Sequence, residues 1–203
     1  METNLHKLWS TPIYESSVPV KAAWLNAAFT GQYERMYSGD GYISRNKYIL
    51  NTLPDLKESL MNHVEIFIRD VLNIAPNCGF KFTNSWFIKH DPNDFAQMHI
   101  HKNSLLSGVY YIDVPPNSGN IKFSKNVGLT NLFSPSVMPD FLERNHITSD
   151  WWEFSPVKSN LILFPSIVEH SVTVNKSDSP RYALAFNLFA TGKFGGVEYE
   201  LEL

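Results

Sequence analysis

The feature that most constrains the fold is a series of short segments with the two-residue period of β-strands, which begins near residue 79 and continues to the C-terminus. The segments are separated by Gly, Pro, Asn, Asp and Ser, and they are rich in aromatic and β-branched residues. Many short strands in one run predict a sandwich, a barrel or a jelly roll. The eight segments read KFTNSWFIKH, SGVYYIDV, GNIKF, DWWEFSP, NLILF, EHSVTV, RYALAFNLF and GGVEYELEL.

The N-terminal part of the chain has a different pattern. Residues 5–19 suggest an edge strand or an extended arm, and residues 21–36 lack a breaker until Gly31 and suggest a helix. A clearer helix follows Pro54, because apolar residues recur every three or four positions over residues 54–72. We therefore expect one domain over residues 1–203, with an arm and supporting helices in residues 1–78 and a β core in residues 79–203.

A single long interruption separates the strands, over residues 124–150. It is rich in Asn, Ser and Pro but also apolar, with Phe133, Met138 and Phe141 close to Trp151. Loops of this length and composition often cover a binding site. We expect either a substrate lid with these residues in its wall or a loop that packs its own apolar side chains.

Charge, hydropathy and cysteine content exclude several classes of partner, of protein and of metal site. The net charge is −3, and no basic run would track a phosphate backbone, so nucleic acid is not expected as a partner. No stretch is long and apolar enough for a membrane span, and the N-terminus lacks the pattern of a signal peptide, so we expect a cytoplasmic protein. Cys78 is the only cysteine, which excludes an internal disulfide and a thiolate-rich metal site. Any metal must be bound by nitrogen and oxygen.

Three histidines and one arginine stand out among the strands. His99 and His101 are two residues apart in an extended stretch, so both imidazoles project from one face. His170 follows a later apolar strand, and Arg181 opens the strand after it. On that last strand, Arg181, Ala183, Ala185 and Asn187 share one face, which is small except at its polar ends. We therefore expect this face to leave room for a ligand, and the guanidinium of Arg181 could donate two parallel hydrogen bonds to a carboxylate of that ligand.

The order and spacing of these residues resemble those of the iron(II) and 2-oxoglutarate-dependent oxygenases, in particular small members from bacteria and marine phages. The resemblance covers roughly residues 84–190. It implies a mainly β fold, a double-stranded β-helix (a cupin-like jelly roll) with flanking N-terminal α-helices. The matching elements are His99-Ile100-His101, the strand Ser107-Gly108-Val109-Tyr110-Tyr111, Phe164-Pro165-Ser166, His170, and Arg181 to Asn187.

The resemblance assigns His99 and His170 as iron ligands, and it places His101 where most members have Asp. The usual site has two His and one carboxylate and leaves three positions for 2-oxoglutarate and dioxygen. Here we rank a three-histidine site with His101 first. A two-histidine site remains open, as does a substitute carboxylate from Asp91, Asp94, Asp113 or Glu169.

The same resemblance implies that Arg181 and Tyr111 bind the distal carboxylate of 2-oxoglutarate, with Asn187 as a further pocket residue. The implied activity is hydroxylation of a substrate with decarboxylation of 2-oxoglutarate to succinate. The sequence does not separate a small-molecule from a peptide substrate. If the gene belongs to a phage, the enzyme would work in the host cytoplasm.

Two other classes of protein fit the same residues. One is a cupin-type metal enzyme that does not use 2-oxoglutarate, and the other is a non-catalytic jelly-roll binding module. Exposed edge strands are predicted near residues 8–14 and 197–203. Either strand could pair with a second copy of the chain, so a homodimer is one possible assembly.

Overall fold

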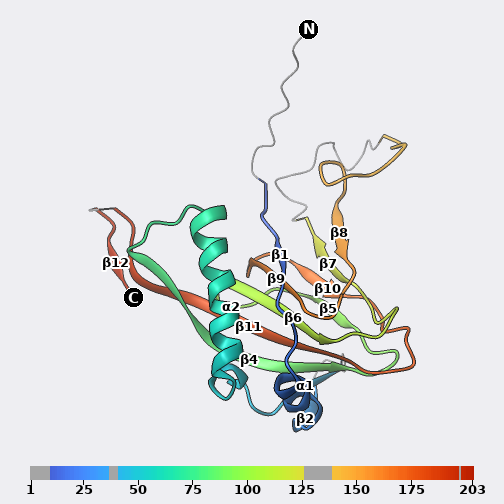
Figure 1. The fold of residues 1–203 in the computed structure, drawn as a ribbon. Helices are drawn as coiled ribbons and strands as arrows, with labels where there is room; N and C mark the ends of the chain where they lie inside the picture. The colour runs from blue at the N-terminus through green and yellow to red at the C-terminus, as the bar shows by residue number, and fades with distance from the viewer. Residues whose placement is uncertain (1–9, 37–40, 126–138, 197) are drawn as a thin grey trace.

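The computed structural model describes residues 10–36, 41–125, 139–196 and 198–203, and its architecture is mainly β (Figure 1). The larger of two antiparallel sheets has eight strands in the order β1-β9-β6-β11-β4-β3-β2, with β12 paired to β11. Its strands are β1 (Tyr14–Ser17), β2 (Tyr33–Arg35), β3 (Tyr42–Ser44), β4 (Cys78–His90), β6 (Leu106–Asp113), β9 (Asn160–Pro165), β11 (Arg181–Phe194) and β12 (Leu201–Glu202).

The smaller sheet has four strands in the order β5-β10-β7-β8. From β4 to β11 the chain alternates between the large and the small sheet, with β7 and β8 as the single consecutive pair in the small one. This is the winding of a double-stranded β-helix, and it confirms the predicted jelly roll. The small sheet consists of β5 (Ala96–His99), β7 (Ile121–Ser124), β8 (Trp151–Phe154) and β10 (His170–Val172).

The two faces of the large sheet contact different layers. On β11, Leu184, Phe186 and Leu188 join the core beneath the helices, whereas Ala183 packs with side chains of the small sheet. Because alternate side chains of a strand share a face, Arg181 and Asn187 also project between the two sheets. The predicted division of this strand into two faces, one beneath the helices and one between the sheets, is therefore confirmed.

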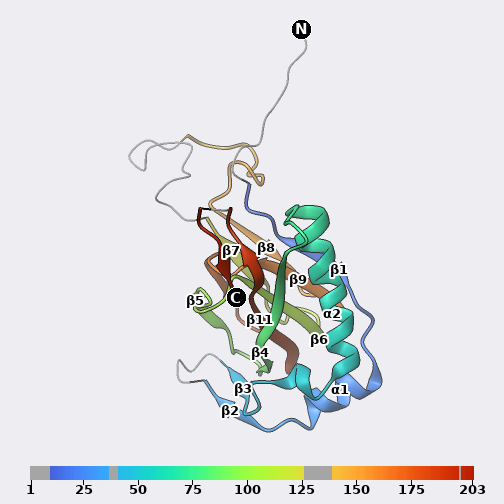
Figure 2. The ribbon, with the colours of Figure 1, turned by 90° about the vertical axis from the view of Figure 1, so that its left-hand side faces the viewer.

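Helices cover the other face of the large sheet, with the small sheet on the opposite side (Figure 2). Helix α2 (Pro54–Ile66) starts at a proline, as predicted, and continues into a π-helical turn (Phe67–Val71). A short 3₁₀ turn (Ile49–Asn51) precedes it. The apolar stripe of α2 is fully buried against the sheet, which accounts for the helix forming here. The buried residues are Leu56, Leu60 and Val64 on α2 and Phe67 and Ile68 on the π-helical turn.

Several elements differ from the predictions. Helix α1 (Ala22–Phe29) ends before Gly31, and the chain then forms β2, so the helix expected up to residue 36 is wrong in its second half. The strand expected over residues 195–203 is reduced to β12. A short strand, β5, was missed as an element of its own, since it lacks alternating hydrophobicity.

The lid predicted over residues 124–150 is described only in part. Phe133 and Met138 lie outside the described residues, and residues 139–150 form turns and bends with mostly exposed or half-buried side chains. Within the described part of the chain, no helix has the length and apolar character needed to cross a membrane.

Candidate metal centre

The structure brings His99, His101 and His170 together between the two sheets. One potential ligand nitrogen from each ring lies within 4.8 Å of the others. The ring centroids are 5.4 Å apart for His99 and His101, 4.3 Å for His99 and His170, and 5.0 Å for His101 and His170. Three imidazoles around one point form a donor set that suits a divalent transition metal. Among the described residues, these three histidines are the candidate metal group.

Strand pairing explains this convergence. His99 ends β5 and lies directly opposite His170, which begins β10, so both side chains project from the same face of the small sheet. His101 lies just beyond β5, and its backbone N–H donates to the carbonyl of Ser166, 3.1 Å away. This bond holds the chain extended and keeps His101 on the side of His99, as the two-residue spacing predicted.

The other ring nitrogen of each histidine is already engaged. Nδ1 of His99 lies 2.7 Å from the carbonyl oxygen of Gln97, and Nδ1 of His170 lies 2.9 Å from that of Val168. Nδ1 of His101 lies 2.6 Å from the amide oxygen of Asn187. Carbonyl and amide oxygens only accept hydrogen bonds, so each Nδ1 carries the proton. Nε2 of each ring is then the atom with a free electron pair for a metal.

Burial keeps two of these imidazoles neutral. His170 is 4% exposed, and desolvation, with a smaller contribution from His99, lowers its pKa to about 3. Desolvation also lowers the pKa of His101. The ring of His170 is enclosed by Phe164 and Phe123, with centroids 4.8 and 5.9 Å away. A metal therefore does not compete with protons at these two rings near neutral pH. His99 is exposed and leaves the centre open on one side.

The depressed pKa of His170 predicts an acid-sensitive metal-free protein. The unfolded chain takes up a proton at this imidazole below its ordinary pKa of 6.5, whereas the folded protein does not until about pH 3. The stabilising contribution is complete above pH 6.5 and is lost as pH falls. From pH 7 to 5.5 we expect wild type to lose about 1 kcal/mol more unfolding free energy than His170→Gln. Urea titrations with a chelator measure this, and equal losses in both proteins would contradict it.

The carboxylates considered as substitute ligands lie elsewhere. Asp94 pairs with Arg35 at 2.8 Å, and Asp91 pairs with Lys89 at 2.9 Å. Asp113 lies 3.5 Å from Lys158. Neither they nor Glu169 join the histidine group. The described residues thus offer a three-histidine set, which would leave a bound divalent metal with its full double positive charge.

Arg181 is a buried cation that has no anionic partner in the part of the chain that the structure describes. It is 3% exposed, and burial lowers its pKa. One guanidinium nitrogen donates to the carbonyls of Ser118 and Gly119, at 3.0 and 2.9 Å, and another contacts Nδ1 of His90. None of these partners is charged negatively, and no carboxylate of the described residues forms an ion pair with it. Burying an unpaired charge is costly, so this arrangement favours an anionic ligand.

Two unsatisfied polar atoms mark where such a ligand would bind. Nε of Arg181 and Oγ of Ser118 are buried and have no hydrogen-bond partner among the described residues. Tyr111 faces the same space, with its ring 5.8 Å from the Arg181 guanidinium carbon. Buried donors are nearly always satisfied, so these two are free to bind a carboxylate. Arg181 and the three histidines both lie between the two sheets, Arg181 at the start of β11 and the histidines at and just beyond the facing ends of β5 and β10.

The other site residues are placed as follows. Tyr111 projects between the sheets, whereas Tyr110 faces the helices and donates to the carbonyl of Val18 at 2.8 Å. Asn187 was predicted as a pocket residue, and its side chain contacts the metal centre through His101. His90 ends β4 directly opposite Arg181 and contacts its guanidinium. No local pattern marks that contact, because the two residues are 91 positions apart.

A row of cross-strand partners extends the centre toward solvent. His99, His170, Phe123 and Trp152 are directly opposite one another across β5, β10, β7 and β8. They therefore share the inner face of the small sheet. The neighbouring Trp151 is on the outer face, where its ring lies 4.2 Å from the Lys122 ammonium. Trp152, which is 44% exposed, therefore lies on the same sheet face as the metal centre, whereas Trp151, the expected wall residue, does not.

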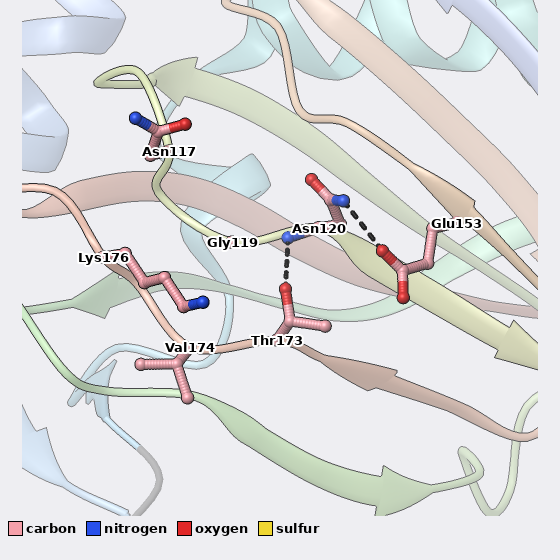
Figure 3. Close-up of a pocket in the computed structure, with 7 residues that line it drawn as sticks. All are labelled: Asn117, Gly119, Asn120, Glu153, Thr173, Val174 and Lys176. Atoms are coloured by element: carbon pink, nitrogen blue, oxygen red, sulfur yellow. Dashed lines mark hydrogen bonds between the residues drawn. The ribbon is translucent and has the colours of Figure 1, made fainter.

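A separate polar pocket of about 340 Å³ opens at the far end of the small sheet (Figure 3). Its wall includes Asn120, whose amide donates to Glu153 at 2.8 Å, and whose backbone N–H donates to Thr173 at 2.7 Å. Gly119 also lines it, and the carbonyl of Gly119 accepts from Arg181. The loop before β7 therefore separates this pocket from the buried arginine. None of the three histidines lines it.

Comparison with known structures gives the same fold. An oxidoreductase of the 2OG-Fe(II) oxygenase family from Burkholderia pseudomallei is 13% identical, with 87% of this chain and 83% of that chain covered and a TM-score of 0.59. A prolyl-4-hydroxylase from Pseudomonas putida is 14% identical, with coverage of 89% and 94% and a TM-score of 0.54. HygX from Streptomyces hygroscopicus, solved with nickel, 2-oxoglutarate and hygromycin B, is 11% identical, with coverage of 88% and 82% and a TM-score of 0.58.

At these identities the solved structures establish the jelly-roll fold. A comparison with curated proteins found no match. The family assignment comes from a family profile described as "Putative 2OG-Fe(II) oxygenase", which matches residues 84–187. That segment is half of the chain and contains all three histidines and Arg181. The chain therefore belongs to the 2OG-Fe(II) oxygenase family, whose enzymes depend on ferrous iron and 2-oxoglutarate.

Proposed function

We propose that the protein is a hydroxylase in which His99, His101 and His170 bind ferrous iron and Arg181, with Tyr111 and Ser118, binds the distal carboxylate of 2-oxoglutarate. The observation that carries this proposal is the buried guanidinium of Arg181, which has no carboxylate partner among the described residues and lies between the same two sheets as the histidines. A neutral ligand would leave this charge uncompensated. A dicarboxylate that reaches the metal with its other end would compensate both charges.

The chemistry that iron and 2-oxoglutarate supply when bound is an oxidation in which dioxygen gives one atom to succinate and one to a C–H bond of the substrate, with release of carbon dioxide. The chain's own residues orient the reactants and exclude water. Ala183 and Ala185 lie between Arg181 and Asn187 on the inner face of β11, and their small side chains leave room for the co-substrate. Phe123 and Phe164 close the inner side of the centre.

The substrate side is the exposed one. His99 is exposed, and so are two apolar side chains on neighbouring segments, Trp152 of β8 at 44% and Ile167 just before β10 at 76%. Such a rim suits a partly apolar small molecule or a peptide. The single cysteine is in keeping with a reducing cytoplasm, or a host cytoplasm for a phage-encoded enzyme. Strand β1 pairs with β9 on one side and ends the large sheet on the other, which supports the proposal of a homodimer through that edge.

Release of ¹⁴CO₂ from 1-¹⁴C-labelled 2-oxoglutarate tests this function without a known substrate. Wild type with ferrous iron, ascorbate and air should release carbon dioxide slowly over several turnovers, because these residues place the co-substrate on the metal. His170→Ala should show no release above the iron-only background. Iron-bound wild type without release would favour a cupin-type enzyme. Wild type that binds no iron would favour a non-catalytic module.

A further inference from the structure

A chain of buried polar side chains lies behind His101. Nδ1 of His101 is 2.6 Å from Oδ1 of Asn187 and 2.8 Å from Oγ of Ser107. The Ser107 hydroxyl donates to the same Asn187 oxygen at 2.8 Å and lies 2.7 Å from Oγ of Ser166, which in turn lies 2.7 Å from Oγ of Ser104. Asn187, Ser107 and Ser166 are 6%, 0% and 1% exposed. The four polar residues form a closed network on one side of the imidazole.

The network comes from β11, β6 and the segments beside β6 and β9. Asn187 on β11 is directly opposite Ser107 on β6, and Ser107 is directly opposite Phe164 on β9, two residues before Ser166, which follows the end of that strand. Three of the four members also belong to short motifs that led to the family resemblance: Ser107 to SGVYY, Ser166 to FPS, and Asn187 to the strand that Arg181 opens. The metal ligands alone do not explain why these motifs contain small polar residues. Their common contact is His101.

The direction of the hydrogen bonds fixes the state of His101. The Asn187 oxygen accepts from Ser107 and faces Nδ1, so Nδ1 must donate. The lone pair of the neutral imidazole is then on Nε2, which faces His99 and His170. His99 and His170 receive the same constraint from backbone carbonyls, whereas His101 receives it from side chains. Loss of the Asn187 oxygen would leave a buried N–H and a buried hydroxyl with fewer acceptors.

We propose that Asn187, supported by Ser107, is a positioning residue that makes His101 the third metal ligand. Its amide oxygen holds His101 in the Nδ1–H form and aims Nε2 at the metal, so that a neutral histidine serves where a carboxylate is usual. The proposal rests on the proposed function only in assuming that a divalent metal binds the three histidines. It predicts that the acceptor at position 187 controls metal affinity and geometry without contacting the metal.

The test is titration with Co(II) alone, followed by its visible absorption, whose intensity and shape depend on the ligand set. Asn187→Leu has similar size but no acceptor, and its Co(II) affinity should fall by about 10- to 100-fold. Its spectrum should approach that of His101→Ala. Asn187→Asp keeps an acceptor for Nδ1–H and for Ser107, so its affinity should stay within about threefold of wild type or exceed it. Circular dichroism verifies folding.

A matched pair of serine variants separates positioning from stability. Ser107 and Ser85 are both buried on strands of the large sheet, but Oγ of Ser85 accepts from the backbone of Leu50 on the helical side. Ser107→Ala should weaken Co(II) binding several-fold, whereas Ser85→Ala should lower stability and leave the Co(II) spectrum unchanged. Equal Co(II) behaviour of the two serine variants would overturn the proposal even if Asn187→Leu did not fold.

Other outcomes distinguish this proposal from the proposed function. Wild-type affinity and spectrum in Asn187→Leu would overturn the positioning role. A tenfold fall in Asn187→Asp would overturn it as well, because the acceptor is retained there. A wild-type spectrum in His101→Ala would mean a two-histidine centre, which refutes the positioning role but leaves the oxygenase function standing. Failure of wild type to bind Co(II) or Fe(II) would refute the metal centre itself.

Discussion

Replacement of His170 by alanine is expected to lower the affinity for ferrous iron by more than about 100-fold and to abolish turnover. Loss of an outer hydrogen-bond partner of a metal ligand typically costs about 10- to 100-fold in affinity, and loss of the ligand itself must cost more. His170 is also the most buried of the three histidines, so water cannot easily replace it. Anaerobic competition with a chromophoric chelator measures the affinity.

His63 provides the control for this variant. It lies on α2, outside the metal centre, and its Nδ1 lies 2.8 Å from the hydroxyl of Tyr14. His63→Ala should lose about 1 kcal/mol of unfolding free energy and bind iron as wild type does. Iron affinity in His170→Ala within tenfold of wild type would show that the cluster is not the iron site.

The second large effect is expected at Arg181. Arg181→Met should lower the affinity for 2-oxoglutarate by at least about 100-fold, because two charge-assisted hydrogen bonds of roughly 1.5 kcal/mol each would be lost. Iron affinity should not change, since Arg181 contacts none of the three histidines. Equilibrium dialysis of labelled 2-oxoglutarate against the anaerobic iron protein measures both proteins under the same conditions.

The unfolding free energy of Arg181→Met gives a second, independent test of the role of Arg181. Methionine removes the desolvation cost of an unpaired buried cation but leaves the carbonyls of Ser118 and Gly119 without a donor. These effects oppose each other, so we expect the unfolding free energy without co-substrate to change by less than about 2 kcal/mol. Arg69→Met is the control, because Arg69 donates to the carbonyls of Ile74 and Ala75 far from the centre. Undiminished 2-oxoglutarate binding in Arg181→Met would refute its assigned role.

The parts of the site that depend on local periodicity could be predicted from the sequence. The two-residue period places His99 beside His101, and Arg181 on the same face of its strand as Asn187, whatever the rest of the fold does. The inward direction of Tyr111 could only be given as one of two choices. On the same strand, Gly108 lies on the opposite face, which packs beneath the helices. A Cβ added there would lie 2.3 Å from the ring of Phe186, so this face has no room for a larger residue at position 108.

The parts that depend on pairing between distant strands could not be predicted. Ser107 and Ser166 are 59 positions apart and Ser107 and Asn187 are 80 apart, so no window of sequence shows their contact. The same holds for His90 beside Arg181 and for the choice of Trp152 over Trp151. Helix α1 was overextended because tertiary pairing of Tyr33 with Ser44 in the sheet overrides a weak helical preference.

The three-histidine set has an electrostatic consequence for the co-substrate. Three neutral imidazoles leave a ferrous centre with charge +2, whereas the usual set with one carboxylate leaves +1. Doubly negative 2-oxoglutarate would then form a neutral complex in a largely buried space, with Arg181 beside its distal end. The variant ligand set therefore favours a dianionic co-substrate.

We propose that iron binds the three histidines and that 2-oxoglutarate binds between that iron and Arg181. Anaerobic titration of the iron(II) protein with 2-oxoglutarate tests it most directly, because chelation of ferrous iron by a 2-oxo acid produces a weak visible charge-transfer band. We predict that the band appears and saturates at one equivalent per iron. Iron-loaded protein that shows no band at saturating 2-oxoglutarate would contradict the claim.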